Sequence, residues 1–280
     1  MTDPLLRIAD ALDRLAPPAQ PAADPTSGDA FVFESGTLRA VAPPPAQPLA
    51  CFVGIDAQRD ALAANLRRHA AGAAAHDVLL WGARGMGKSS LVGSVHAVIT
   101  AECATSSMGG LALVQVARDD LDRLPALFRI LAPVARRFIV YADDVSFEAD
   151  ERQYKALRSV LDGGIEARPD HVRLIVTSNR RHLVAREHAE TEAASAVNAR
   201  DVLDDRLALA DRFGLSLGFH NADQADYLAM VAGYAAAHGL AFTQADALAW
   251  AAGRGHRSGR VAWQFTVELA GRANRAITPA

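Results

Sequence analysis

The segment GARGMGKS at residues 82–89 has the spacing of a phosphate-binding loop, G-x-x-x-x-G-K-[ST]. Its glycines allow the backbone to curl so that N–H groups point toward phosphate oxygens. Lys88 would place a compact positive charge on the β- and γ-phosphates, and the Ser89 hydroxyl is a ligand for Mg²⁺. The motif predicts a nucleoside-triphosphate site formed by Gly82, Ala83, Arg84, Gly85, Met86, Gly87, Lys88, Ser89 and Ser90.

The scarcity of lysine supports this prediction. The chain has 29 basic residues, and all except Lys88 and Lys155 are arginines. A guanidinium group is broad and planar, so arginine is a poor substitute for the compact ammonium group that this loop needs. A glycine-rich turn that fits the pattern by chance is the alternative. The lysine at the required position, between an apolar run and a helical pattern, argues against it.

Two carboxylates follow a second apolar run, in RRFIVYADDVSFE at residues 136–148. Asp143 is expected to hold Mg²⁺ directly or through water, and Asp144 to polarise the water that attacks the γ-phosphate. Many ATPases have Glu at the second position, and Asp is shorter by one methylene. Glu148 is a further candidate, and an Asp-Asp cap on the next segment is the alternative reading.

Two other polar side chains lie next to apolar runs. Asn179 ends the run LIVTSN and could orient the attacking water, although an asparagine in a plain turn is the alternative. Arg212 precedes the last apolar run and could reach the nucleotide of a neighbouring subunit as an arginine finger, with Arg206 as runner-up. The alternative for Arg212 is a surface ion pair with Asp205 or Asp211.

The last helical pattern begins in a basic segment, GRGHRSGRVAWQF at residues 253–265. Positive charge at a helix N-terminus opposes the helix dipole, so a bound anion would explain it. Arg260 lies in the first turn and is the residue expected to contact the nucleotide, with Arg257 second. A plain basic helix start is the alternative.

Apolar runs alternating with helical patterns predict an α/β fold in which helices cover both faces of a parallel sheet. We expect five strands, at 78–81, 111–116, 138–142, 173–178 and 215–219. The helices expected between and before them are at 4–15, 88–102, 120–132, 151–162 and 199–211. A small all-α domain should follow, with helices near 223–238, 243–253 and 258–274.

The chain therefore divides into three predicted parts. Nine of the 13 prolines lie in the first 48 residues, so we interpret residues 1–49 as an N-terminal arm and an extended, unpacked proline-rich linker. Residues 50–220 are the expected α/β core, and residues 221–280 the helical lid domain.

Composition excludes several classes of protein. Half of the residues are hydrophobic and 22% are charged, which is typical of a globular chain and not of a disordered one. The net charge of −3 argues against constitutive nucleic-acid binding. Two cysteines, no long apolar run and no signal-peptide pattern predict a cytoplasmic protein without a membrane span.

In order along the chain, the loop, the acidic pair, Asn179, Arg212 and Arg260 resemble the AAA+ ATPases. FVGID near residues 52–56 is similar to the segment that packs by the adenine in that superfamily. The intervening strand at 111–116 is typical of the branch that usually hydrolyses ATP, and the missing N-K-x-D motif disfavours GTP.

A bacterial AAA+ family, catalogued as domain of unknown function 815, is more similar still. The strings that carry this resemblance, over roughly residues 35–275, are LLWGARGMGKSSLV, DDVSFE, TSNRRHLV, DRFGLSLGF and RSGRVAWQF. The resemblance implies a P-loop core with central strand order 5-1-4-3-2, a helical lid, and ATP with Mg²⁺ as ligands.

Three functions fit these observations. The first is an AAA+ ATPase whose hydrolysis of ATP changes the conformation of a partner protein or nucleoprotein complex. The second is a nucleotide-dependent switch or loader with little turnover, which the short Asp144 favours. The third, a small-molecule kinase, lacks an evident acceptor site. We expect a homo-oligomer with an unidentified protein client. The basic cluster at 180–182 could contact a neighbouring subunit or nucleic acid, or be a solvated edge.

Overall fold

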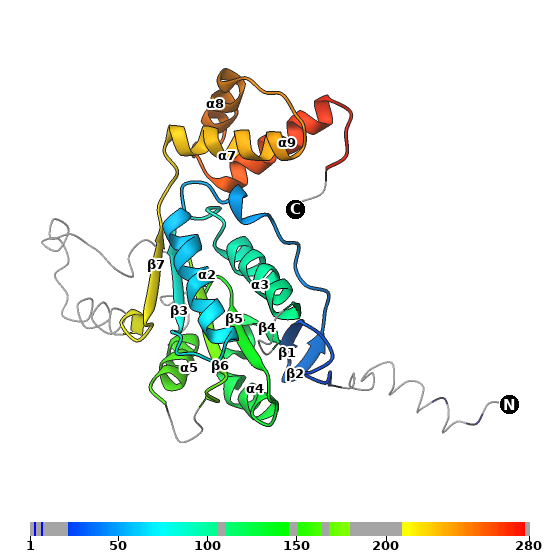
Figure 1. Cartoon of the computed structure of the whole chain (residues 1–280), viewed down its shortest axis with the longest axis vertical. Helices are drawn as coiled ribbons and strands as arrows, with labels where there is room; N and C mark the ends of the chain where they lie inside the picture. The colour runs from blue at the N-terminus through cyan, green and yellow to red at the C-terminus, as the bar shows by residue number, and fades with distance from the viewer. Residues whose placement is uncertain are drawn as a thin grey trace, which may run out of the picture.

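The computed structural model describes residues 3, 7, 22–105, 110–145, 151–163, 168–179 and 209–277. In these ranges an α/β core carries a bundle of three helices at one end (Figure 1). Glu148, the basic cluster at 180–182 and Arg206 lie outside the described residues, as do most of the helices expected at 4–15 and 199–211.

The sheet is larger than the sequence predicted. The expectation of a five-stranded sheet is corrected by a seven-stranded mixed sheet, whose order is β2-β1-β4-β5-β6-β3-β7. The five expected strands are β3 to β7, and from β7 to β4 they lie in the expected central order, 5-1-4-3-2. All neighbouring strands run parallel except the antiparallel pair β1–β2. The strands are β1 (Ala30–Glu34), β2 (Thr37–Ala40), β3 (Val78–Gly82), β4 (Leu111–Val116), β5 (Arg137–Ala142), β6 (Val172–Ser178) and β7 (Leu215–Phe219).

The two additional strands form a hairpin inside the segment interpreted as arm and linker. Ser35 and Gly36 make its two-residue turn, and both have positive φ angles, 52° and 75°. Phe31 and Phe33 of β1 are buried in the core, and β1 pairs in parallel with β4. The flanking prolines obscured this pattern, although alternating apolar residues around a Ser-Gly turn are a recognised hairpin signal.

Alternate strand residues pack on opposite faces of the sheet. On one face, Leu80, Ile139 and Ile175 join a core with α2 (Asp56–Ala70) and α3 (Lys88–Ala104). On the other face, Leu79 and Val140 pack in a second core with η2 (Arg118–Arg123), α4 (Leu124–Leu131) and α5 (Glu151–Leu161). The polar groups that follow the strands are therefore held at one edge of a rigid, two-sided core.

The helical bundle comprises α7 (Gln224–Ala237), α8 (Gln244–Gly253) and α9 (Gly259–Arg272). Each helix begins at a residue whose side chain accepts a backbone N–H three residues later: Asp223, Thr243 and Ser258. Tyr227 and Phe265 are buried in its interior. Among the described residues, no helix combines the length and apolar character needed to cross a membrane.

A buried histidine joins α2 to the sheet and makes the core sensitive to acid. His69 is 0% exposed, and its Nε2 lies 3.1 Å from the carbonyl oxygen of Phe138. Its Nδ1 has no hydrogen-bond partner among the described residues, so a second proton there would be buried without an acceptor. Burial lowers the pKa of His69 to about 4.

We expect the free energy of unfolding to fall as the pH drops from 6.5 toward 4. The unfolded state takes up a proton near pH 6.5 whereas the folded state resists it down to about 4, so His69 stabilises the fold fully only above pH 6.5. Urea unfolding should give a value about 2 kcal/mol lower at pH 5 than at pH 7.5 from this residue. His69→Gln should reduce this pH dependence, and an unchanged dependence would contradict the assignment. His256→Gln, at an exposed site, is the control.

Candidate nucleotide-binding site

A cavity of about 590 Å³ lies between the carboxyl ends of the sheet strands and the three-helix bundle. One part of its wall is polar and comes from the segments that follow β3, β5 and β6. The other part is mainly apolar and comes from residues 44–55, α7 and α9. The predicted site residues in its lining are Gly85, Met86, Gly87, Lys88, Ser89, Ser90, Asp143, Asp144, Asn179 and Arg260.

The loop between β3 and α3 depends on its glycines. Gly82, Gly85 and Gly87 have φ angles of 119°, 75° and 85°, which other residues rarely adopt. A Cβ at Gly82 would lie 2.1 Å from the carbonyl oxygen of Phe219 in β7. A Cβ at Gly85 would lie 3.1 Å from the Ser258 hydroxyl, where α9 begins. The loop thus packs closely against both the sheet and the bundle.

Lys88 begins α3 and is only 5% exposed. Its ammonium group donates to the carbonyl oxygens of Gly82 and Ala83, at 3.0 and 2.8 Å, and to Oδ1 of Asn179 at 3.0 Å. All three acceptors are uncharged. Burial lowers the pKa of Lys88 to about 8, although the Asp143 and Asp144 carboxylates raise it. The loop therefore holds a buried cation beside the cavity, which is a favourable place for an anion.

Asp143 follows β5 and is held by three hydroxyl groups. Its Oδ1 accepts hydrogen bonds from Ser89 at 2.8 Å, Tyr141 at 2.6 Å and Thr177 at 2.6 Å. Burial alone would raise the pKa of this carboxyl, but these hydrogen bonds outweigh burial and lower the pKa below its ordinary value. Burial and the Asp143 charge raise the pKa of Tyr141, so its hydroxyl stays a donor.

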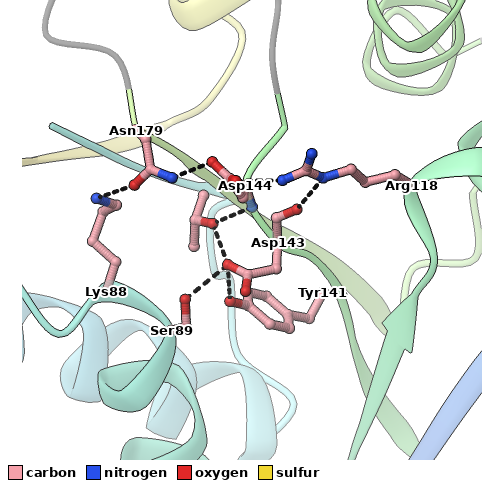
Figure 2. A network of polar contacts seen from close by, with 8 residues as sticks. Lys88, Ser89, Arg118, Tyr141, Asp143, Asp144 and Asn179 are labelled. Atoms are coloured by element: carbon pink, nitrogen blue, oxygen red, sulfur yellow. Dashed lines mark hydrogen bonds and ion pairs between the residues drawn. The ribbon is translucent and has the colours of Figure 1, made fainter. Parts of the chain in front are cut away.

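Asp144 lies between a cationic donor and an amide donor, as Figure 2 shows. Nδ2 of Asn179 donates to its Oδ1, and the Arg118 guanidinium forms an ion pair with its Oδ2. Its backbone N–H donates to Thr177 Oγ1 at 2.7 Å. The φ angle of Asp144 is 51°, a left-handed conformation that Asp and Asn adopt more readily than other non-glycine residues. Asn179 thus connects Lys88 with Asp144.

The two predicted arginines lie in different places. Arg260 lines the cavity, and its backbone N–H donates to the Gly85 carbonyl oxygen at 3.0 Å. Arg257 is outside the lining. Arg212 lies before the amino end of β7, whereas the phosphate-loop motif follows the carboxyl end of β3, and it forms an ion pair with Asp162. Arg212 does not join the other candidate residues within this chain.

Two residues that hold the acidic pair, Tyr141 and Arg118, lack a signal in the sequence. Tyr141 sits inside an apolar strand and reads as core, and Arg118 follows β4, the strand that precedes the acidic one. The apolar wall was missed in part because Pro44 and Gln47 belong to a segment interpreted as an unpacked linker. Only the FVGID segment indicated this wall, and its Phe52, Val53 and Ile55 line the cavity.

The donor set fits a magnesium nucleotide. Mg²⁺ is commonly held by one or two carboxylates or hydroxyls together with phosphate oxygens and water. Ser89 and Asp143 are the pair able to hold it here, since their side chains already meet at 2.8 Å. Among the described residues there is no cluster of three or more His, Cys, Asp or Glu that would form an all-protein metal cage. The site is therefore suited to an ion that arrives with phosphates.

Comparison with solved structures shows the fold. The chain is similar to one single-residue variant of Thermotoga maritima RuvB, with 16% identity and a TM-score of 0.51, over 83% of this chain and 67% of that one. For a second such variant the identity is 17%, the TM-score 0.51, and the coverage 84% and 69%. The chain is also similar to Aeropyrum pernix ORC1 in complex with DNA, with 15% identity and a TM-score of 0.57, over 81% of this chain and 63% of that one. This chain spans about two thirds of their length.

The comparison with curated proteins gave no match. The family described as "Protein of unknown function (DUF815)" matches residues 26–273, which include the β1–β2 hairpin, the core and the helical bundle. RuvB and ORC1 are AAA+ ATPases, and their similarity agrees with the order of motifs along this chain. The chain belongs to the DUF815 family and has the fold of an AAA+ P-loop ATPase.

Proposed function

We propose that this protein binds ATP with Mg²⁺ in the 590 Å³ cavity and hydrolyses it, and that hydrolysis changes the conformation of a partner protein or nucleoprotein complex. One observation carries the proposal. The buried ammonium group of Lys88, the Ser89–Asp143 pair and the Asn179–Asp144 pair meet around one cavity at the edge of the sheet. Positive charge, metal ligands and a carboxylate for water are the groups that phosphoryl transfer needs.

Each residue has a separate part in this proposal. Lys88 and the backbone N–H groups of the loop hold the β- and γ-phosphates. Mg²⁺ on Ser89 and Asp143 supplies charge neutralisation at the phosphate oxygens. Asp144 orients and polarises the attacking water, and Asn179 fixes the position of the Asp144 carboxylate. Arg260, on the helical bundle, contacts the phosphates and couples the position of the bundle to the nucleotide.

The proposal extends to assembly. Arg212 is 28% exposed and lies away from the cavity of its own chain, so a catalytic role for it requires a second subunit. Arginine fingers of this kind stabilise negative charge in the transition state of a neighbour's site. We therefore propose a homo-oligomer in which Arg212 completes the adjacent site. The proposed client is a protein or a nucleoprotein complex.

A nucleotide-dependent switch with little turnover is the second candidate. The Asp144 carboxylate is engaged by Arg118 and Asn179, and it is shorter than the Glu that many ATPases use. Both features favour slow hydrolysis. The two candidates share nucleotide binding and differ only in whether the subunit turns over ATP by itself.

Steady-state ATP hydrolysis with Mg²⁺, measured across protein concentration, tests the proposal. We expect the rate per subunit to rise with concentration as subunits assemble. Arg212→Ala should lower the plateau by about 10³-fold, the lower end of what arginine fingers contribute. Nucleotide affinity should stay the same, since Arg212 lies outside the cavity of its own chain.

Arg272→Ala is the matched control, because Arg272 is also a surface arginine in an ion pair, with Glu268. A plateau that Arg212→Ala leaves unchanged would contradict the finger. ATP binding without turnover at any concentration would favour the switch.

A further inference from the structure

The Asp143 carboxylate accepts hydrogen bonds from side chains at only one of its two oxygens. Hydroxyl groups from three different elements donate to Oδ1: Ser89 of α3, Tyr141 of β5 and Thr177 of β6. Figure 2 shows the contacts of Ser89 and Tyr141 meeting at this oxygen. Among the described residues, no side chain donates to Oδ2. A carboxylate has about four lone-pair sites on its two oxygens, so three donors fully engage Oδ1 and leave Oδ2 for a metal ion or its water.

The Tyr141 hydroxyl reaches Asp143 from the core and not from the cavity. Tyr141 is 5% exposed and belongs to the core that β5 shares with α2 and α3. Asp143 and Thr177 line the cavity, whereas Tyr141 does not, so a ligand in the cavity would leave its hydrogen bond intact. A residue needed only for packing could be phenylalanine, since a buried hydroxyl is costly unless it is hydrogen-bonded. The bond to Asp143 is what accounts for tyrosine here.

The other two hydroxyls are also fixed in direction. Thr177 Oγ1 accepts the backbone N–H of Asp144 at 2.7 Å, and its own proton goes to Asp143. Ser89 donates its one hydroxyl proton to the same oxygen and keeps its lone pairs for a metal ion. Three separate elements therefore hold the Asp143 carboxylate in one orientation.

A carboxylate held in this way distinguishes between Mg²⁺ and Ca²⁺. Ca²⁺ takes about six to eight oxygen ligands in flexible geometry, and carboxylates often bind it through both oxygens. Mg²⁺ requires a near-ideal octahedron and binds one or two carboxylates together with water and phosphate oxygens. Asp143 offers one fixed oxygen, and it cannot offer both while Oδ1 accepts three protons. This arrangement favours Mg²⁺.

We propose that Tyr141 is a positioning residue that keeps Asp143 a one-oxygen ligand, and that the site thereby prefers Mg²⁺ to Ca²⁺ as the ion that accompanies the nucleotide. The inference rests on the proposed function, because the ion enters with the phosphates of ATP. Tyr141 itself touches neither the ion nor the nucleotide. Hydrogen-bond partners of metal ligands commonly tune metal affinity in this way.

Calorimetric titration of the full chain with a non-hydrolysable ATP analogue measures this preference without turnover. The titration is done once with Mg²⁺ and once with Ca²⁺, each at a concentration that saturates the nucleotide. We expect wild type to bind more tightly with Mg²⁺. Tyr141→Phe, which keeps the ring and removes only the hydroxyl, should reduce the ratio of the two affinities about tenfold, the lower end of what such partners contribute.

Two further sets of variants make the result specific. Tyr227→Phe is the matched control, because it removes another buried hydroxyl, which donates to the Ala247 carbonyl oxygen at 3.1 Å inside the helical bundle. It should leave the ratio unchanged. Thr177→Val removes a second donor to Oδ1 from the neighbouring strand and should lower the ratio, whereas Thr177→Ser should restore it.

The outcomes separate this inference from the proposed function. An unchanged ratio in Tyr141→Phe, or an equal loss of affinity with both ions, would overturn the role of Tyr141 and leave nucleotide binding in place. Equal wild-type affinity with Mg²⁺ and Ca²⁺ would overturn the preference itself. A wild-type chain that binds the analogue with neither ion would overturn the proposed function and this inference with it. A lower ratio in Tyr141→Phe, with a melting temperature within a degree or so of wild type, supports the inference.

Discussion

Lys88→Ala is expected to weaken ATP binding by at least about a hundredfold and to abolish hydrolysis. The substitution removes the buried ammonium group beside the cavity, which in the proposed function donates hydrogen bonds to the β- and γ-phosphates. Hydrogen bonds to charged groups are worth about 1.5–3 kcal/mol each, and about 1.4 kcal/mol corresponds to a tenfold change in affinity. Calorimetric titration of ATP with Mg²⁺ measures the effect directly.

Two further variants sharpen this experiment. Lys155→Ala is the matched control, because Lys155 is the second lysine of the chain and is exposed on α5. Lys88→Arg keeps the charge but replaces a compact ammonium group with a planar fork, so it should not restore binding. Wild-type ATP affinity in Lys88→Arg would show that the loop requires a positive charge but not a compact ammonium group. Wild-type affinity in Lys88→Ala would contradict the assignment of the loop.

The loop was predictable because its chemistry is contiguous in sequence. Residues 82–89 contain the glycines, the lysine and the serine, and the apolar run before them and the helical pattern after them identify β3 and α3. The five strands from β3 to β7 were also predicted to within two residues at each end, since buried parallel strands are continuous apolar runs.

The hairpin and the supporting residues Tyr141, Thr177 and Arg118 escaped prediction for physical reasons. β1 is a strand because it pairs with β4, which is distant in the sequence. The proline-rich composition of the first 48 residues instead predicted an unpacked linker. Tyr141 and Thr177 act on Asp143 through hydroxyl groups of strand residues that otherwise look like core. Arg118 reaches Asp144 from beyond the end of the neighbouring strand β4, a contact that no local pattern reports.

The phosphate loop contacts the helical bundle on one side and, through Asn179, the acidic pair on the other. The Arg260 N–H holds the Gly85 carbonyl oxygen, so the bundle rests on the phosphate loop itself. The Asn179 amide accepts a hydrogen bond from Lys88 and donates one to Asp144. A phosphate that draws Lys88 away would therefore break the first of these bonds and free the amide that holds Asp144. Binding at the loop can therefore alter the water-orienting carboxylate through one side chain.

Asp144→Asn is expected to lower ATP hydrolysis by at least about a hundredfold while changing ATP affinity less than about threefold. A group that orients and polarises water contributes about 10²–10⁴ to the rate, and the amide has the same shape without the charge. The left-handed φ angle of 51° makes Asn the right probe, because Asn adopts this conformation as readily as Asp. Single-turnover phosphate release and equilibrium titration give the two quantities separately.

Asp122→Asn, an exposed carboxylate in η2 outside the cavity lining, is the control for lost surface charge. Equal hydrolysis by Asp144→Asn and wild type would remove Asp144 from the mechanism. Asp144→Glu tests instead why the chain has the shorter acid. Glutamate matches the commoner ATPase pattern but fits a positive φ angle less well. A lower rate for Asp144→Glu would mean that this backbone conformation, and not the reach of the side chain, determines the choice of aspartate.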